Sequence, residues 1–195
     1  ISSLFGPFEH ELAVIPNGVE PEQFVKLPKK PRFKFDADDK VVFFIGRLVP
    51  EKGIWHLVQA FPQVLYKIPD ARLVIGGKGP MKNDLDKAAL ELGINNRILY
   101  TGFIKEEARN YLFHRAQVAV FPSLYEPFGI VALEAMATNT PVIVGDVGGL
   151  AGIVQDGFNG LKVKPGDIDD LAEAIIKVLA DQQMADRLKR NGIQT

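Results

Sequence analysis

Two glutamates, Glu126 and Glu134, stand eight residues apart in a segment that carries few other charges. From residue 130 to 137 every residue except Glu134 is apolar, so we predict a helix that is buried nearly all round. An ionised carboxylate is costly in such surroundings unless hydrogen-bond donors satisfy it. Two vicinal ligand hydroxyls could do so, at about 1.5–3 kcal/mol per bond, and so could a protein group such as a backbone N–H or Arg47. The pair therefore indicates a site for a polyhydroxyl ligand, with a structural role for Glu134 as the alternative.

The segment Gly46-Arg47-Leu48-Val49-Pro50-Glu51-Lys52-Gly53 combines two cations with a glycine at each end. It follows an apolar run and leads into a helical pattern. Backbone N–H groups at the helix start can therefore join Arg47 and Lys52 in binding an anion such as phosphate. The alternative is a solvated loop in which Arg47 and Glu51 pair at the surface. The segment matches neither a Walker A loop nor Gly-x-Gly-x-x-Gly, which disfavours P-loop NTPases and dehydrogenases.

A second helix start lies between the two glutamates. Pro127 and Gly129 fix how the loop enters the helix, and the N–H groups of Gly129, Ile130 and Val131 point out of its N-terminus. A further glycine-rich segment, 76–80, would let a ligand or a neighbouring loop approach the backbone closely. Two carboxylates, a glycine and a helix N-terminus together predict a functional site at the end of a strand.

Short apolar runs alternate with amphipathic segments along most of the chain. The runs read as strands buried on both faces of a parallel sheet, and the segments between them read as helices. The predicted strands are 41–45, 72–75, 97–100, 118–121, 141–144 and 161–163, and the predicted helices are 54–66, 81–92, 106–115, 129–137 and 168–179, the last with Asp167 as N-cap. This alternation predicts an α/β fold with an open, doubly wound, Rossmann-like parallel sheet. Ligands of such sheets bind beyond the carboxyl ends of the strands, where the segments above lie.

Composition excludes several classes of protein. The chain has 195 residues, 47% of them hydrophobic, and a net charge of −1, which argues against nucleic acid or a membrane surface as main partner. It has no cysteine, so disulfide scaffolds, Cys-based zinc sites and thiol nucleophiles are excluded. Three Asp-x-Asp pairs read as solvated charge, and the three histidines stand too far apart for a short metal motif. We therefore expect no metal and no cofactor.

The first 35 residues differ from the rest. Residues 13–15 form a short apolar run before a turn signal, and 26–34 is basic and interrupted by proline. We interpret 1–35 as an incoming linker with an edge strand, and 36–195 as one domain. Because the chain begins with Ile1 and ends after a helical run without an evident cap, we expect a piece of a longer protein. Nothing at its start predicts a signal peptide and no apolar stretch is long enough to span a membrane, so we expect a cytoplasmic protein.

The motifs at 46–53 and 122–129, together with Glu126 and Glu134, resemble those of glycosyltransferase family 4. Gly148-Gly149 and the stretch from Asp156 to Asp167 are similar as well, and the match runs from about Ile15 to the C-terminus in the family's order. The resemblance implies the C-terminal, donor-binding half of a GT-B enzyme, which retains anomeric configuration and works without a metal ion. It also implies that the N-terminal acceptor domain is absent from this chain.

The resemblance assigns roles to individual residues. Arg47 and Lys52, next to Gly46, would grip the diphosphate of a nucleotide-sugar donor and stabilise the charge that develops as the nucleotide leaves. Glu134 would accept from the ribose hydroxyls and Glu126 would face the sugar. The remaining expected contacts are backbone groups, at Phe128, Gly129, Ile130 and Val131 for sugar and phosphate and at Phe103 and Ile104 for the base.

Two alternatives stay open at this point. One is a GT-B sugar-nucleotide epimerase, which uses the same cleft without an acceptor. The other is a non-catalytic nucleotide-sugar-binding module in which Glu126 and Glu134 are structural.

Overall fold

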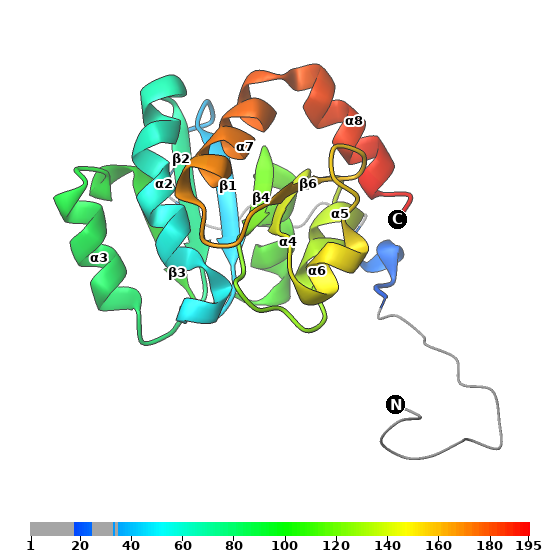
Figure 1. The fold of residues 1–195 in the computed structure, drawn as a ribbon, viewed down its shortest axis with the longest axis horizontal. Coiled ribbons are helices and arrows are strands. Elements are labelled where there is room, and N and C mark those ends of the chain that lie inside the picture. The colour runs from blue at the N-terminus through cyan, green and yellow to red at the C-terminus, as the bar shows by residue number, and fades with distance from the viewer. Residues whose placement is uncertain (1–17, 25–32, 34) are drawn as a thin grey trace, which may run out of the picture.

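The computed structural model describes residues 18–24, 33 and 35–195, and in this part of the chain a parallel sheet carries helices on both faces (Figure 1). All neighbouring strands are parallel, in the order β3-β2-β1-β4-β5-β6. The strands are β1 (Lys40–Ile45), β2 (Ala71–Gly76), β3 (Ile98–Gly102), β4 (Val118–Phe121), β5 (Val142–Gly145) and β6 (Leu161–Val163). The predicted doubly wound, Rossmann-like sheet is confirmed, and each predicted strand is present within two residues of its expected bounds.

Alternate residues of the central strands face the two helical layers. On β1, Val42 and Phe44 join one buried cluster, while Val41 and Phe43 join the other. The first cluster includes residues of α2 (Ile54–Lys67), α3 (Lys82–Glu91), α7 (Ile168–Ala180) and α8 (Gln182–Gly192). The second includes residues of α4 (Glu106–Arg115), α5 (Ile130–Ala137) and α6 (Gly148–Ile153). The central strands are buried on both faces, as their unbroken hydrophobicity predicted.

Short elements complete the described chain. The 3₁₀ turns are η1 (Pro21–Gln23), η2 (Pro50–Lys52) and η3 (Asn95–Arg97). Asp167 caps α7, since its Oδ1 accepts from the backbone N–H of Asp170 at 3.1 Å, as predicted. The segment 18–24 lies on the same side of the molecule as the C-terminus (Figure 1), and its Phe24 is buried. The predicted strand at 13–15 lies outside the described residues, so the linker and edge strand assigned to 1–35 stay a prediction.

The prediction that residues 130–137 are buried nearly all round was wrong. Only Ala132, Ala135 and Met136 of α5 are buried, and Ile130 is 39% exposed. These three side chains pack against the sheet, while the side of the helix that carries Ile130, Val131 and Glu134 faces a cavity. Hydrophobicity alone could not show this, because an apolar helix that lines a cavity has the same composition as one in the core.

Strand order determines where a ligand can bind. Strands β1 and β4 are neighbours in the centre of the sheet, and the chain proceeds outward from them in opposite directions. The connections that follow β1 and β4 therefore diverge, which opens a crevice at their carboxyl ends. The segments that carry Lys52 and Glu126 follow these two strands.

Candidate active site

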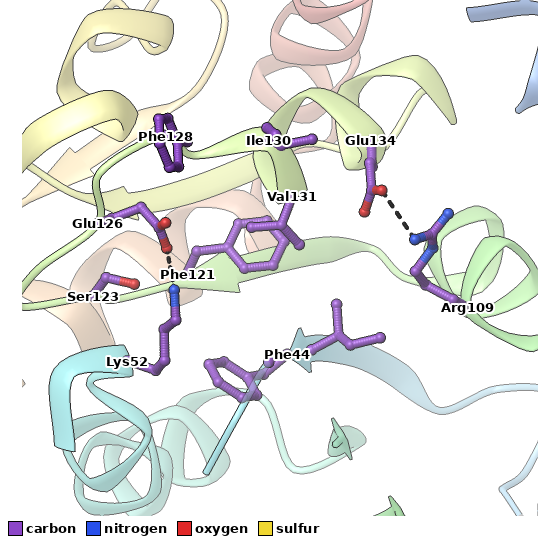
Figure 2. A pocket seen from close by; sticks show the side chains of 12 residues that line it. Phe44, Lys52, Arg109, Phe121, Ser123, Glu126, Phe128, Ile130, Val131 and Glu134 are labelled. Atoms are coloured by element: carbon purple, nitrogen blue, oxygen red, sulfur yellow. Dashed lines mark hydrogen bonds and ion pairs between the residues drawn. The ribbon is translucent and has the colours of Figure 1, made fainter. Parts of the chain in front are cut away.

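A cavity of about 330 Å³ lies at the carboxyl ends of β1 and β4. This volume falls within the range of small-molecule sites. Figure 2 shows an ion pair at each end of it, Lys52 with Glu126 and Arg109 with Glu134. Between the pairs lie the apolar side chains of Phe44, Phe121 and Val131 (Figure 2), and Ile45 and Ile130 belong to the same lining. The cavity thus offers charged groups at its two ends and apolar surface between them.

The first ion pair joins the two loops that diverge at the crevice. Lys52 Nζ lies 2.5 Å from Glu126 Oε2, and the Glu126 side chain is only 10% exposed. The backbone N–H groups of Leu124 and Tyr125 both donate to the Glu51 carbonyl oxygen, which ties the loops together beside the pair. Gly53, at φ 66°, allows this approach, because a Cβ there would lie 1.8 Å from the carbonyl oxygen of Pro122. These contacts explain the glycine at the end of the cationic loop.

The second ion pair was not predicted. Arg109 on α4 donates from a terminal guanidinium nitrogen to Glu134 Oε1 at 2.9 Å. Burial raises the pKa of Glu134, the nearby guanidinium of Arg109 lowers it, and Glu106 raises it further. Arg47, which the sequence offered as one protein partner for Glu134, was the wrong arginine. A helix rich in charge gave no signal that one of its arginines would face inward.

The start of α5 forms one wall of the cavity. Gly129 adopts φ 76° there, which explains the glycine, and Ile130 and Val131 line the cavity from the first turn. The N–H groups of a first helical turn have no acceptor within their helix, so they can serve a ligand. Phe128 lines the same wall with 63% of its surface exposed. Behind it, a Cβ on Gly149 would lie 2.3 Å from the Phe128 carbonyl oxygen, so the Gly148-Gly149 pair sets the position of this loop.

The other residues selected from the sequence lie at the same edge of the sheet. Gly46 lines the cavity, whereas the neighbouring Arg47 is exposed and is not among the lining residues. Phe103 and Ile104 follow β3 outside the cavity lining; Phe103 is 75% exposed, and Ile104 approaches Gly76. The structure therefore brings together Lys52, Glu126, Glu134 and the start of α5. Sequence reasoning missed Arg109 and also Ser123, a buried residue of the lining.

The described residues offer neither a cluster that could hold a metal ion nor a helix that could span a membrane. No group of three or more histidine, aspartate or glutamate side chains in that part of the chain is arranged to hold a metal ion. No helix found there has both the length and the apolar character needed to cross a bilayer.

Several known glycosyltransferases and related proteins are similar to this chain. An uncharacterised glycosyltransferase of Methanocaldococcus jannaschii is 39% identical over 93% of this chain and 48% of its own length. A glycogen synthase of Mycobacterium tuberculosis is 35% identical over 97% of this chain and 45% of its own length. The crystal structure of Anabaena HepE in complex with UDP and glucose superposes with a TM-score of 0.75 at 28% identity, over 80% of this chain and 43% of that one. The chain thus spans about half the length of these relatives.

The family model described as "Glycosyl transferases group 1" matches residues 26–195. That range contains both loops, both glutamates and all the strands of the sheet. The chain therefore belongs to the group 1 glycosyltransferase family.

Proposed function

We propose that this chain is the nucleotide-sugar donor domain of a hexosyltransferase that moves a sugar from a nucleoside-diphosphate sugar to an acceptor. The proposal includes retention of anomeric configuration and independence from metal ions. The observation that carries it is the cavity at the β1–β4 crevice with Lys52 and Glu126 at one end and Glu134 at the other. Such a cavity matches a donor with an anionic diphosphate and two groups rich in hydroxyls, the sugar and the ribose.

Lys52 and Arg47 would bind the diphosphate. Lys52 already lines the cavity, so it would exchange its partner Glu126 for a phosphate oxygen when the donor binds. Arg47 is exposed five residues earlier on the same loop, and its long side chain would turn inward to add a second cation. The two charges would stabilise the nucleoside diphosphate as the glycosidic bond breaks, which is how the domain would dispense with a metal.

Glu126, released from Lys52, would accept hydrogen bonds from the sugar hydroxyls. The first-turn N–H groups of α5 and the backbone of Phe128 and Gly129 would contact sugar and phosphate. Glu134 would accept from the ribose, and the backbone at Phe103 and Ile104 would meet the base. The segments that would contact the base, the diphosphate and the sugar follow β3, β1 and β4, which lie in this order across the sheet.

The acceptor would be bound by another domain of the full protein. The chain spans about half the length of its relatives, and the loop that follows β4 at the crevice carries exposed apolar side chains, among them Tyr125 and Phe128. Without that second domain to position an acceptor and exclude water, we expect negligible turnover from this chain. Its cytoplasmic location stays a prediction.

Titration calorimetry with UDP, ADP, GDP and their glucose esters tests the donor site. We expect one nucleotide series to bind, and addition of EDTA to leave that affinity unchanged. Glu134→Gln, which removes the proposed ribose acceptor, should weaken this binding. Its matched control is Glu173→Gln, which alters an exposed carboxylate on α7 and should leave binding unchanged. If none of the six compounds binds at millimolar concentration, the proposed function is wrong.

One observation favours a second candidate, a binding module without catalysis. Glu134 already has a protein partner in Arg109, as a structural glutamate would. If Glu134→Gln lowers thermal stability while nucleotide affinity is unchanged, the structural role is the better explanation.

In the full-length protein, the anomeric configuration of the product, followed by NMR, tests retention.

A further inference from the structure

Arg109 is held in place by several groups besides Glu134. Its Nε donates to Asn110 Oδ1 at 3.2 Å, and a terminal nitrogen lies 3.8 Å from Glu106 Oε1. Its guanidinium also lies over the ring of Phe24, 5.8 Å from the ring centre. The Arg109 side chain is only 21% exposed, so it forms a fixed part of the cavity wall.

The pair leaves half of the Glu134 carboxylate for another donor. Arg109 engages Oε1, and within the described part of the chain Oε2 has no hydrogen-bond partner. In Figure 2 the carboxylate of Glu134 points away from α5, and Arg109 lies on one side of it and the cavity on the other. An ionised carboxylate oxygen accepts from up to two hydroxyls, so the unengaged atom suits a vicinal diol.

We infer that Arg109 is a positioning residue of the nucleotide site, which holds Glu134 ionised and oriented so that its second oxygen receives the ribose hydroxyls. This inference rests on the proposed function, because it takes the ligand diol from the nucleotide. It adds a residue of α4 to the site, and it gives Phe24, which precedes the domain core, an indirect part in binding. Phe24 is itself fixed, since its carbonyl oxygen lies 2.8 Å from His114 Nε2.

The charged groups around Glu134 shift its pKa in opposite directions, which makes the inference testable. Arg109 lowers the pKa of Glu134 and Glu106, on the same helix, raises it. Lys52 and Glu126 line the same cavity from its other end. Elements α6, β4 and β5, which pack near α5, carry no titratable side chain, and α8 approaches α5 through Gly192 and Met136. Removal of Arg109 and removal of Glu106 should therefore move the titration in opposite directions.

The first measurement needs no ligand. In the chain labelled with ¹³C at glutamate Cδ, the signal that Glu134→Gln abolishes identifies Glu134, and its shift is followed against pH. We expect Arg109→Met to move the midpoint to higher pH and Glu106→Gln to move it to lower pH. Arg109→Lys should stay near the parent. Lys105→Met, which removes an exposed cation at the start of α4, is the control. A loss of stability could not produce opposite shifts. If Arg109→Met does not fold, Arg109→Gln, which removes the same charge and keeps an amide donor, takes its place and should also move the midpoint to higher pH.

The second measurement is the affinity of the same variants for UDP, or for ADP or GDP if one of these binds better. At neutral pH we expect Arg109→Met to weaken binding about tenfold, the loss of one charged hydrogen bond, and Arg109→Lys to restore most of it. The pH at which affinity falls should follow the midpoint measured for Glu134.

The outcomes separate the two proposals. An unchanged Glu134 titration in Arg109→Met overturns the positioning role, whatever the nucleotide does. A shifted titration with unchanged nucleotide affinity overturns it as well, because the ion pair would then be structural. If the parent binds none of the nucleotides, the proposed function fails, and the titration alone decides whether Arg109 controls the ionisation of Glu134 for a structural purpose.

Discussion

Lys52 and Glu126 form an ion pair of 2.5 Å across the crevice, although 74 residues separate them in the chain. Lys52 follows β1 and Glu126 follows β4, so the pair links the two loops where the connections after these neighbouring strands diverge. In the proposed mechanism a donor phosphate takes the place of Glu126. The pair therefore keeps both groups satisfied until the ligand arrives.

Lys52→Met should leave Glu126 largely buried without its cation. We expect a loss of about 1–2 kcal/mol in the free energy of unfolding, and a larger loss of affinity for UDP than for uridine, because only UDP carries the diphosphate. Urea unfolding and calorimetry measure the two effects. Lys177→Met, at an exposed pair on α7, is the control and should change stability by no more than about 0.5 kcal/mol. Equal losses for UDP and uridine would contradict a phosphate contact for Lys52.

The pH dependence of stability should report the buried carboxylate of Glu134. Burial raises its folded-state pKa above the ordinary value of 4.5, so the folded protein holds this proton more tightly than the unfolded chain does. Its contribution to stability is then full below the ordinary pKa and is lost as pH rises through the folded one. Glu134→Gln cannot titrate. The stability of the parent relative to this variant should therefore fall from about pH 4.5 upward. Urea unfolding of both proteins across this range measures it, and a relative stability that rises with pH would contradict the assignment.

Gly149→Ala should disturb the loop at the start of α5. The added Cβ would meet the Phe128 carbonyl oxygen at 2.3 Å, so the loop or α6 must move. We expect a loss of about 1–3 kcal/mol in stability together with weaker nucleotide binding. Gly152→Ala is a matched control on the same helix, because nothing lies within 4 Å of its added Cβ. It should leave binding unchanged and stabilise the helix by up to about 1 kcal/mol. Thermal unfolding and calorimetry of the two variants would decide, and equal effects would contradict this role of Gly149.

Asn159→Ala should destabilise the chain without affecting the ligand. The buried Asn159 accepts from the backbone N–H of Gln155 at 2.7 Å and donates to the Ile153 carbonyl oxygen and to Thr195 Oγ1. Loss of these three bonds should cost about 2–3 kcal/mol. Because the residue lies outside the cavity lining, nucleotide affinity should change less than about twofold, a difference below roughly 0.5 kcal/mol. A large fall in affinity with little change in stability would move Asn159 into the site.

The sequence by itself determined the elements and the edge where the site lies. Unbroken apolar runs predicted the six strands, because burial on both faces of a parallel sheet demands them. The order of the motifs after these strands placed Lys52, Glu126 and Glu134 at one edge, and glycines marked the turns with positive φ at Gly53 and Gly129. Local chemistry was enough for these conclusions.

Only the tertiary structure decided which charges meet. Arg109 and Glu134 lie on helices α4 and α5, which meet because both cover the same face of the sheet, α4 against β1 and α5 against the adjacent β4. A sequence shows which residues share a helix, but not which way that helix turns toward its neighbour. For the same reason α5 looked wholly buried from its composition, although one side of it faces the cavity. The partners of both glutamates depend on packing between elements, which local pattern does not encode.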